Sequence, residues 1–258
     1  MTPLRRHGAA AALSALLAAC AAGGPPPGQQ PDRVEGDVTV LAAASLTDVL
    51  AELSGRFEER YPGTRVVVST GGSTALAAQA VAGAPGDVLV TASPEAMRVA
   101  VDGGATTGEP ALLARNRLEI AVPAGNPAGV GGLADLADPA LLVALCAPEV
   151  PCGAASEALL ADAGVDARPD TLERDVRAVL TKVRLGEVDA GLVYRTDVLA
   201  GGGDVEGLAV AGAERHANDY LVTRLDGAPH PAGADAFVDL LLSETGREVL
   251  VGAGFDVP

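Results

Sequence analysis

Four short stretches place small, hydrogen-bonding residues where an apolar, strand-like run gives way to a helix. They are centred on Ser45, Ser73, Cys152 and Asp175-Val176. The first backbone N–H groups of a helix lack intrahelical partners and the helix dipole is positive there, so each turn can hold an anion. Four such turns in one chain favour a shared anion site over four unrelated helix starts.

The alternative for each turn is a purely structural role. Ser45 and Asp48 fit the Ser-x-x-Asp capping box, which predicts a helix that begins at Leu46 with the Ser45 hydroxyl as its cap. Gly72-Ser73 on its own indicates an ordinary flexible turn, and Asp175 indicates a helix cap.

Short β-branched or aliphatic runs alternate with longer helical ones from Val38 onward, which predicts an α/β fold with a parallel sheet covered by helices. In such sheets, ligands bind at the carboxyl ends of the strands. The predicted strands cover 38–42, 64–69, 87–91, 118–122, 141–145, 190–194, 205–210 and 219–224. The predicted helices cover 46–60, 73–82, 94–102, 133–137, 154–163, 176–185, 233–242 and 244–251.

The N-terminus indicates export. Arg5 and Arg6 precede a short apolar run that ends in Leu-Ala-Ala-Cys20, which resembles a bacterial lipobox. We expect a signal peptide over 1–19, a lipid on Cys20 and a disordered tether over 20–36, which place the protein on the outer face of the cell membrane or in the periplasm. An ordinary signal peptide with an incidental cysteine is the alternative.

Composition and net charge limit the classes of molecule that the protein can bind. The 258 residues allow one large domain or two modest lobes, with an aliphatic core because the chain has no Trp. The formal charge of −16 becomes −18 when Arg5 and Arg6 are removed, so nucleic acid is excluded as a partner. A small anion is still compatible, because fixed dipoles dominate inside a pocket.

The remaining cysteines and histidines indicate structure rather than catalysis. Cys146 and Cys152 bracket a short loop in an exported chain, which favours a disulfide, two reduced thiols being the alternative. His216 and His230 have no metal-ligand spacing, so no site for a free metal cation is predicted. An exported serine hydrolase using Ser45 or Ser73 is a remote alternative, because the chain lacks a Gly-x-Ser-x-Gly elbow.

Five separated motifs, taken together and in order, resemble the extracytoplasmic molybdate-binding proteins of ABC uptake systems, the ModA family. The resemblance runs from Val38 to the end of the chain. It rests on Ala42-Ala-Ala-Ser-Leu-Thr-Asp48, Gly72-Ser-Thr with Gln79-Ala-Val-Ala-Gly-Ala-Pro-Gly-Asp87, Val150-Pro-Cys-Gly153, Asp175-Val-Arg177 and Gly191-Leu-Val-Tyr194.

The resemblance implies a type II periplasmic-binding-protein fold, in which two α/β lobes with two chain crossings close on a tetrahedral oxyanion. Its ligand-binding residues fall on the hydroxyls of Ser45, Ser73 and Tyr194 and on the backbone N–H groups of Cys152 and Val176. Relatives often have Ala where this chain has Cys152, which leaves a backbone contact intact. A core role for Tyr194 is the alternative, and Arg177 is interpreted as a solvated residue that is not a ligand.

The same resemblance implies a monomeric, non-enzymatic receptor without a cofactor that binds molybdate or tungstate and delivers it to an ABC permease. A sulfate or other oxyanion receptor and a purely structural surface lipoprotein are the alternatives. We expect lobe 1 over 37–119, lobe 2 over 120–220 and a return segment over 221–258, with the breakers at 123–127 marking the first crossing.

Overall fold

The computed structural model describes residues 34–258, which form one compact unit with two five-stranded sheets. The predicted signal peptide, the lipid site at Cys20 and most of the tether lie outside the described residues. The predicted tether ends one residue too late, because Gly36 already belongs to the first strand. Within the described chain, no helix is both long and apolar enough to span a membrane.

The first sheet has the strand order β2-β1-β3-β10-β4. Its parallel strands are β1 (Gly36–Ala43), β2 (Thr64–Gly71) and β3 (Val88–Thr91). β10 (Asn218–Leu225) runs antiparallel between β3 and β4 (Thr106–Asn116). The sheet is therefore mixed, which corrects the parallel sheet predicted from the alternation of strands and helices.

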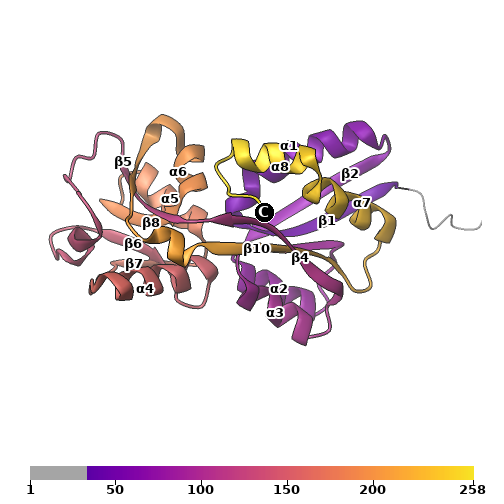
Figure 1. The fold of residues 1–258 in the computed structure, drawn as a ribbon, viewed down its shortest axis with the longest axis horizontal. Coiled ribbons are helices and arrows are strands. Elements are labelled where there is room, and N and C mark those ends of the chain that lie inside the picture. Colours follow the sequence, from indigo (N-terminus) through magenta and orange to yellow (C-terminus); the bar gives the residue numbers. More distant parts are fainter. Residues whose placement is uncertain (1–33) are drawn as a thin grey trace, which may run out of the picture. The chain divides into compact units, whose positions relative to one another are not determined.

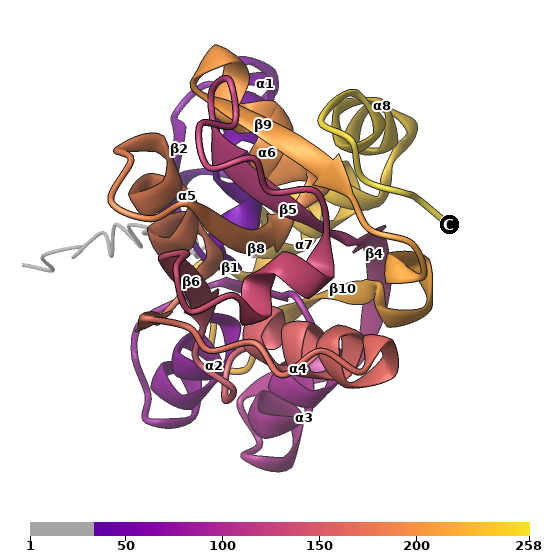
Figure 2. The same ribbon diagram turned by 90° about the vertical axis from the view of Figure 1, so that its left-hand side faces the viewer.

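The second sheet has the order β7-β6-β8-β5-β9 and repeats this plan. β6 (Val143–Cys146), β7 (Thr171–Glu173) and β8 (Ala190–Tyr194) are parallel. β5 (Leu118–Pro123) runs antiparallel to β8 and to β9 (Val205–Ala209). Figure 2 views this sheet with β9, β5, β8 and β6 following one another across it.

The helices cover both faces of each sheet. In the first lobe, α2 (Ser73–Val81) and α3 (Pro94–Asp102) lie on one face, and α1 (Thr47–Arg60), α7 (Pro231–Leu242) and α8 (Glu244–Gly252) lie on the other (Figure 1). The second lobe carries α4 (Pro151–Ala163), α5 (Val176–Arg184) and α6 (Arg195–Gly201). Short 3₁₀ turns cover Ala44–Leu46, Leu133–Ala137, Gly202–Asp204 and Ala213–His216.

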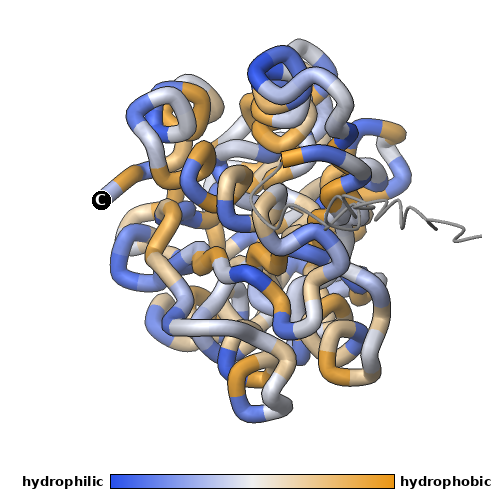
Figure 3. Tube along the Cα trace, turned by 90° about the vertical axis from the view of Figure 1, so that its right-hand side faces the viewer, coloured by the Kyte–Doolittle hydropathy of each residue, from blue (hydrophilic) through white to orange (hydrophobic). Residues whose placement is uncertain are grey.

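Each face of the first sheet has its own aliphatic core. Val38, Val40 and Val90 pack with Leu50 and Phe237 on the side of α1 and α7, whereas Leu41 and Leu89 pack with α2 and α3. Burial on both faces explains the nearly continuous apolar runs of the central strands. The helices lie between these cores and the solvent, and Figure 3 shows hydrophobic and hydrophilic residues alternating along their coils.

The chain crosses between the sheets twice. β4 ends at Asn116 in the first sheet and β5 begins at Leu118 in the second, so the first crossing is at Arg117. The prediction that the breakers at 123–127 mark this crossing is wrong, because β5 already pairs with β8 and β9. The second crossing leads from β9 to β10, which begins at Asn218.

The C-terminal segment lies against the first crossing. Asp256 and Arg115 exchange two backbone hydrogen bonds, of 2.6 and 3.0 Å, in an isolated antiparallel bridge. The carboxylate of Asp256 also pairs with the guanidinium of Arg117 at 3.1 Å. The end of the chain therefore fastens the end of β4 and the crossing residue in place.

Candidate anion site between the two lobes

One small cavity of about 20 Å³ lies where the two lobes face each other. The residues that line it follow the carboxyl ends of β1, β2, β3, β6, β7 and β8, the edge at which α/β sheets bind ligands. Its volume suits one small ion and is far below the roughly 300 Å³ of a typical organic ligand pocket. The lining residues are Ala43, Ala44, Ser45, Gly71, Gly72, Ser73, Ala92, Val150, Pro151, Cys152, Asp175, Val176 and Tyr194.

Ser45 lies in the 3₁₀ turn that separates β1 from α1. The helix begins at Thr47 and no side chain caps it, so the predicted capping box of Ser45 and Asp48 is wrong. The Ser45 hydroxyl instead lies 2.7 Å from the hydroxyl of Tyr220 in β10. The Ser45 hydroxyl therefore hydrogen-bonds to a distant residue and does not cap the helix as the local sequence pattern had predicted.

Ser73 is the first residue of α2, as the Gly-Gly turn predicts. Its hydroxyl oxygen accepts a hydrogen bond from the backbone N–H of Ala92 at 2.9 Å. An N–H group can only donate, so the hydroxyl hydrogen of Ser73 is free to point at a ligand. Ser73 is therefore prepared to act as a donor toward the cavity.

Two helix N-termini of the second lobe supply backbone donors. Pro151 begins α4 and has no N–H, so Cys152 contributes the first one. Val176 begins α5, and the Asp175 carboxylate caps that helix by accepting from Ala178 at 3.0 Å, as predicted. The N–H groups of Cys152 and Val176 donate to no group within the described residues. Both point the positive end of a helix at the cavity.

The disulfide predicted between Cys146 and Cys152 is present. It closes the short loop that joins β6 to α4 and that carries Val150 and Pro151 to the cavity wall. The backbone is so crowded here that a Cβ at Gly153 would lie 1.9 Å from the Ala147 carbonyl oxygen. The bridge and the glycine together fix where the Cys152 N–H points.

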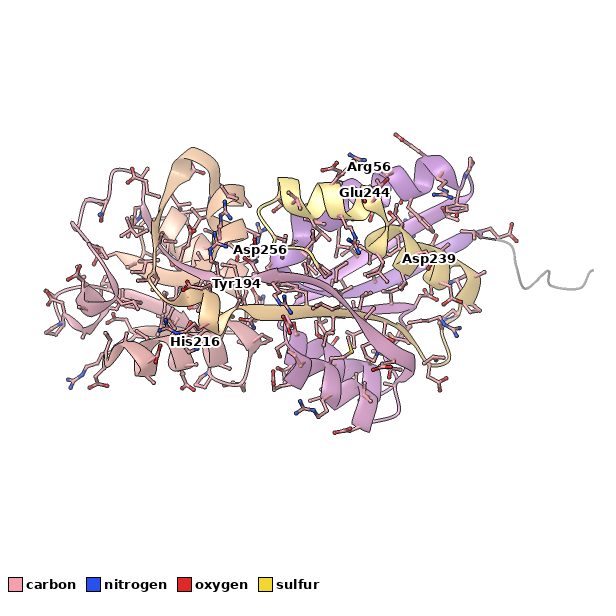
Figure 4. The ribbon with its side chains drawn as sticks, in the orientation of Figure 1. Arg56, Tyr194, His216, Asp239, Glu244 and Asp256 are labelled. Carbon is pink, nitrogen blue, oxygen red and sulfur yellow. A yellow bond between two sulfur atoms is a disulfide. The ribbon has the colours of Figure 1, made fainter. Side chains whose placement is uncertain are left out.

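Tyr194 ends β8 and is 1% exposed. Figure 4 places it near the junction of the two sheets. Its hydroxyl makes no hydrogen bond of normal geometry within the described residues, although Tyr220 is its neighbour. Burial raises the pKa of Tyr194 well above its usual value, so the phenol keeps its hydrogen. A buried donor without an acceptor is what a site that awaits an anion requires.

An ionic network lies behind Tyr194. One oxygen of the fully buried Asp197 accepts from the Tyr194 N–H at 3.1 Å, and the other lies 2.8 Å from Nε of Arg177. Arg177 also pairs with Asp48 of the first lobe at 2.5 Å. The interpretation of Arg177 as a solvated residue is therefore wrong, although it does not line the cavity.

Within the described residues, the electrostatics of the cavity come from dipoles and not from cationic side chains. Asp175 is the charged residue of the lining, and its carboxylate is engaged at the start of α5. Hydrogen bonds from neutral donors to an ionised acceptor are shorter and stronger than neutral ones. The arrangement can therefore bind a small dianion without a paired cation.

The structure brings together all five residues that the sequence predicts for the ligand. It also adds Tyr220 and Asp197, which the sequence analysis missed because neither belongs to a strand-to-helix turn. His216 pairs with Asp162, and His230 lies beside Asp87. Among the described residues, neither of these two imidazoles lines the cavity that Ser45 and Ser73 line.

Two α/β lobes that are joined by two crossings and that line one small cavity define the periplasmic-binding-protein class. A family model described as bacterial extracellular solute-binding protein matches residues 38–256. A solved periplasmic molybdate-binding protein of Azotobacter vinelandii has the same fold, with a TM-score of 0.72 and 21% identity, covering 86% of this chain and 99% of that one.

Two relatives show to which group within this family the chain belongs. The molybdate-binding protein ModA of Mycobacterium tuberculosis H37Rv is 34% identical over 228 residues, which cover 88% of this chain and 87% of that protein. The ModA protein of Escherichia coli K12 is 32% identical over 242 residues, which cover 86% and 90%. The chain belongs to the bacterial extracellular solute-binding proteins and, among them, to the ModA family.

Proposed function

We propose that this protein is a high-affinity receptor for molybdate that delivers the anion to the membrane permease of an ABC transporter. Five donors support the proposal: the hydroxyls of Ser45, Ser73 and Tyr194 and the N–H groups of Cys152 and Val176, all around one small cavity. The observation that carries it is the unpartnered, buried hydroxyl of Tyr194. The ligands named for the ModA relatives supply the identity of the anion.

The donor set favours an oxyanion that has lost all its protons. A protonated oxyanion such as hydrogen phosphate carries a P–O–H group, which is itself a donor. Because the groups of the site that face the ligand are donors too, this P–O–H group would have no hydrogen-bond acceptor. Tungstate has the same charge and shape as molybdate, so we propose that it binds too. Sulfate is a smaller dianion, so the size of the cavity is what would separate it from molybdate and tungstate.

The receptor acts outside the cell membrane as a monomer, held to it by a lipid on Cys20. Closure of the two lobes around the anion is the state that the permease recognises. Cys20→Ser tests the anchor, because the variant should move from the membrane fraction to the soluble fraction while its anion binding stays unchanged.

Calorimetric titration of the purified full-length protein with molybdate, tungstate, sulfate and hydrogen phosphate tests the ligand. We expect molybdate and tungstate to bind tightly and sulfate to compete poorly. At an anion concentration of 100 Kd the thermal stability should rise by about 2.7 kcal/mol, since the ligand binds only the folded state. The variant Ser45→Ala/Ser73→Ala is the control. Sulfate binding more tightly than molybdate would replace this proposal with that of a sulfate receptor.

A further inference from the structure

A second buried tyrosine lies behind the cavity, on the strand that returns to the first lobe. Tyr220 of β10 is 0% exposed, and its hydroxyl lies 2.7 Å from Oγ of Ser45. Its ring packs edge-on against Phe255, with centroids 5.2 Å apart, and against Tyr194, with centroids 6.1 Å apart. These contacts prevent the phenol from swinging away from Ser45.

We infer that Tyr220 is a positioning residue that sets anion specificity: it donates its hydrogen to Ser45 and so turns the Ser45 hydrogen into the cavity. The inference rests on the proposed function and deepens it. Tyr220 does not line the cavity, so it acts through Ser45 and not on the anion.

The direction of the hydrogen bond follows from the ligand. From the geometry of the pair alone, either hydroxyl can be the donor. A fully deprotonated oxyanion offers only acceptors, so Ser45 must give its single hydrogen to the ligand, and the hydrogen between the two residues must then come from Tyr220. Burial raises the pKa of Tyr220 above its usual value, against its interactions with Ser45, Asn116 and Tyr194, so that this hydrogen is retained at neutral pH.

The two serines of the site are thus oriented by different means. Ser73 accepts from the backbone N–H of Ala92, which no side-chain substitution removes. Ser45 accepts from a side chain, so its orientation depends on one hydroxyl. Without it, the Ser45 hydroxyl is free to rotate and to accept a hydrogen from a protonated anion. A substitution that removes the Tyr220 hydroxyl should therefore weaken the selectivity against hydrogen phosphate.

A double-mutant cycle with Ser45→Ala and Tyr220→Phe tests the inference, because Phe keeps the ring and removes only the hydroxyl. We expect Tyr220→Phe to weaken molybdate binding about fivefold, the net value of one hydrogen bond, and to lower the ratio of molybdate affinity to hydrogen phosphate affinity. In the Ser45→Ala background, Tyr220→Phe should have no further effect on molybdate. Tyr61→Phe, at the half-buried residue that follows the last residue of α1, is the matched control.

The ratio of affinities does not depend on the folded fraction, since both anions bind the same folded molecules. Tyr220→Met gives a second variant without a hydroxyl, and the same fall in the ratio is expected. An unchanged ratio in both variants, or an equal loss of molybdate affinity with and without Ser45, would overturn the inference and leave the proposed function standing. If the wild type binds sulfate but not molybdate, the proposed function fails, and the same cycle with sulfate still decides the role of Tyr220.

Discussion

Arg177 and Asp48 lie 129 residues apart in the sequence and form an ion pair across the two lobes, with a guanidinium nitrogen 2.5 Å from a carboxylate oxygen. Arg177 is in the first turn of α5 beside Val176, and Asp48 is in the first turn of α1 close to Ser45. The pair therefore directly connects two of the turns that line the cavity. Since each partner belongs to a different lobe, the contact depends on closure.

Asp48→Asn should speed the release of molybdate. The Asp48 side chain is 62% exposed, so solvent screens the pair and limits its value to about 1 kcal/mol, which corresponds to a severalfold faster dissociation. Stopped-flow displacement measures this rate. Glu52→Gln, which removes an ion pair with Arg56 inside α1, is the matched control and should leave the rate unchanged. A wild-type rate in Asp48→Asn would show that the pair does not hold the lobes together.

Gly72→Ala should prevent full closure without damaging the fold. Gly72 has a φ of −66°, which alanine adopts freely. An added Cβ would nevertheless lie 2.5 Å from the carbonyl oxygen of Arg174 and 3.3 Å from Val150, both in the second lobe. We expect molybdate affinity to fall at least tenfold, or about 1.4 kcal/mol, by calorimetry, while the melting temperature without ligand stays the same.

Gly55→Ala is the control for that experiment, because nothing lies within 4 Å of a Cβ at this helical position. It should preserve affinity and slightly raise stability. Full affinity in Gly72→Ala would mean that the lobes bind the anion without approaching as closely as they do here.

Removing the Tyr194 hydroxyl should lower the affinity for molybdate without lowering the stability of the ligand-free protein. Tyr194→Phe deletes a hydroxyl without a normal hydrogen bond, so the ligand-free protein should not lose stability. Its molybdate affinity should fall roughly 10- to 100-fold, as expected for a hydrogen bond to a charged group.

Ser73→Ala, by contrast, should lower both quantities. It leaves the buried N–H of Ala92 without an acceptor, which costs about 1 to 3 kcal/mol of folding free energy. Thermal unfolding without ligand distinguishes the two variants. Equal destabilisation by both would contradict the assignment of the Tyr194 hydroxyl as a donor that waits for the anion.

Asp197 should make stability depend on pH. Burial raises its pKa from the usual 3.8 to about 7, a shift that the charge of Arg177 opposes. Between these two values the folded state holds a proton that the unfolded state has lost, so stability is greatest at low pH, falls as pH rises through 7 and then levels off.

Asp197→Asn removes this titration and keeps an oxygen that can accept from the Tyr194 N–H. At about 1.4 kcal/mol per pKa unit, the Asp197 contribution is limited to about 4 kcal/mol. Thermal unfolding from pH 5 to pH 8 should therefore give a smaller fall for the variant than for the wild type. Parallel curves for the two proteins would assign the pH dependence to other groups.

Much of the fold could be predicted because its signals are local. The strand Ala190–Tyr194, the short 3₁₀ turn Leu133–Ala137 and the start of α8 at Glu244 follow the predicted residues. The same holds for α3, where Ser93 caps and Pro94 occupies the first position. The signal of a strand-to-helix turn lies in a few consecutive residues, so the residues of these turns that line the cavity could be predicted.

The elements that were missed lack such signals. β4 is an edge strand whose first half is largely exposed and contains Glu109 and Pro110, so it shows neither an apolar run nor an alternation. β7 has only three residues. α6 begins directly after Tyr194, without a loop to separate it from β8.

The residues behind the cavity, Tyr220 and Asp197, are placed there by tertiary contacts, so residue spacing in the sequence could not predict them. Ser45 and Tyr220 are 175 residues apart, and Tyr220 occupies an ordinary strand position. Asp197 reads as a first-turn acidic residue of a helix, and only the packing of α5 against α6 brings Arg177 to it. The capping pattern at Ser45 misled for the same reason, because a distant partner competed for the hydroxyl.

The attachment of Asp256 to Arg115 and Arg117 matters when the C-terminus of the protein is altered. Arg117 lies at the first of the two crossings between the lobes, so a rotation of one lobe against the other would act on this residue, to which the end of the chain is attached. Truncations that remove Asp256 would release the end of β4 and Arg117 from these contacts, although Asp256 does not line the cavity.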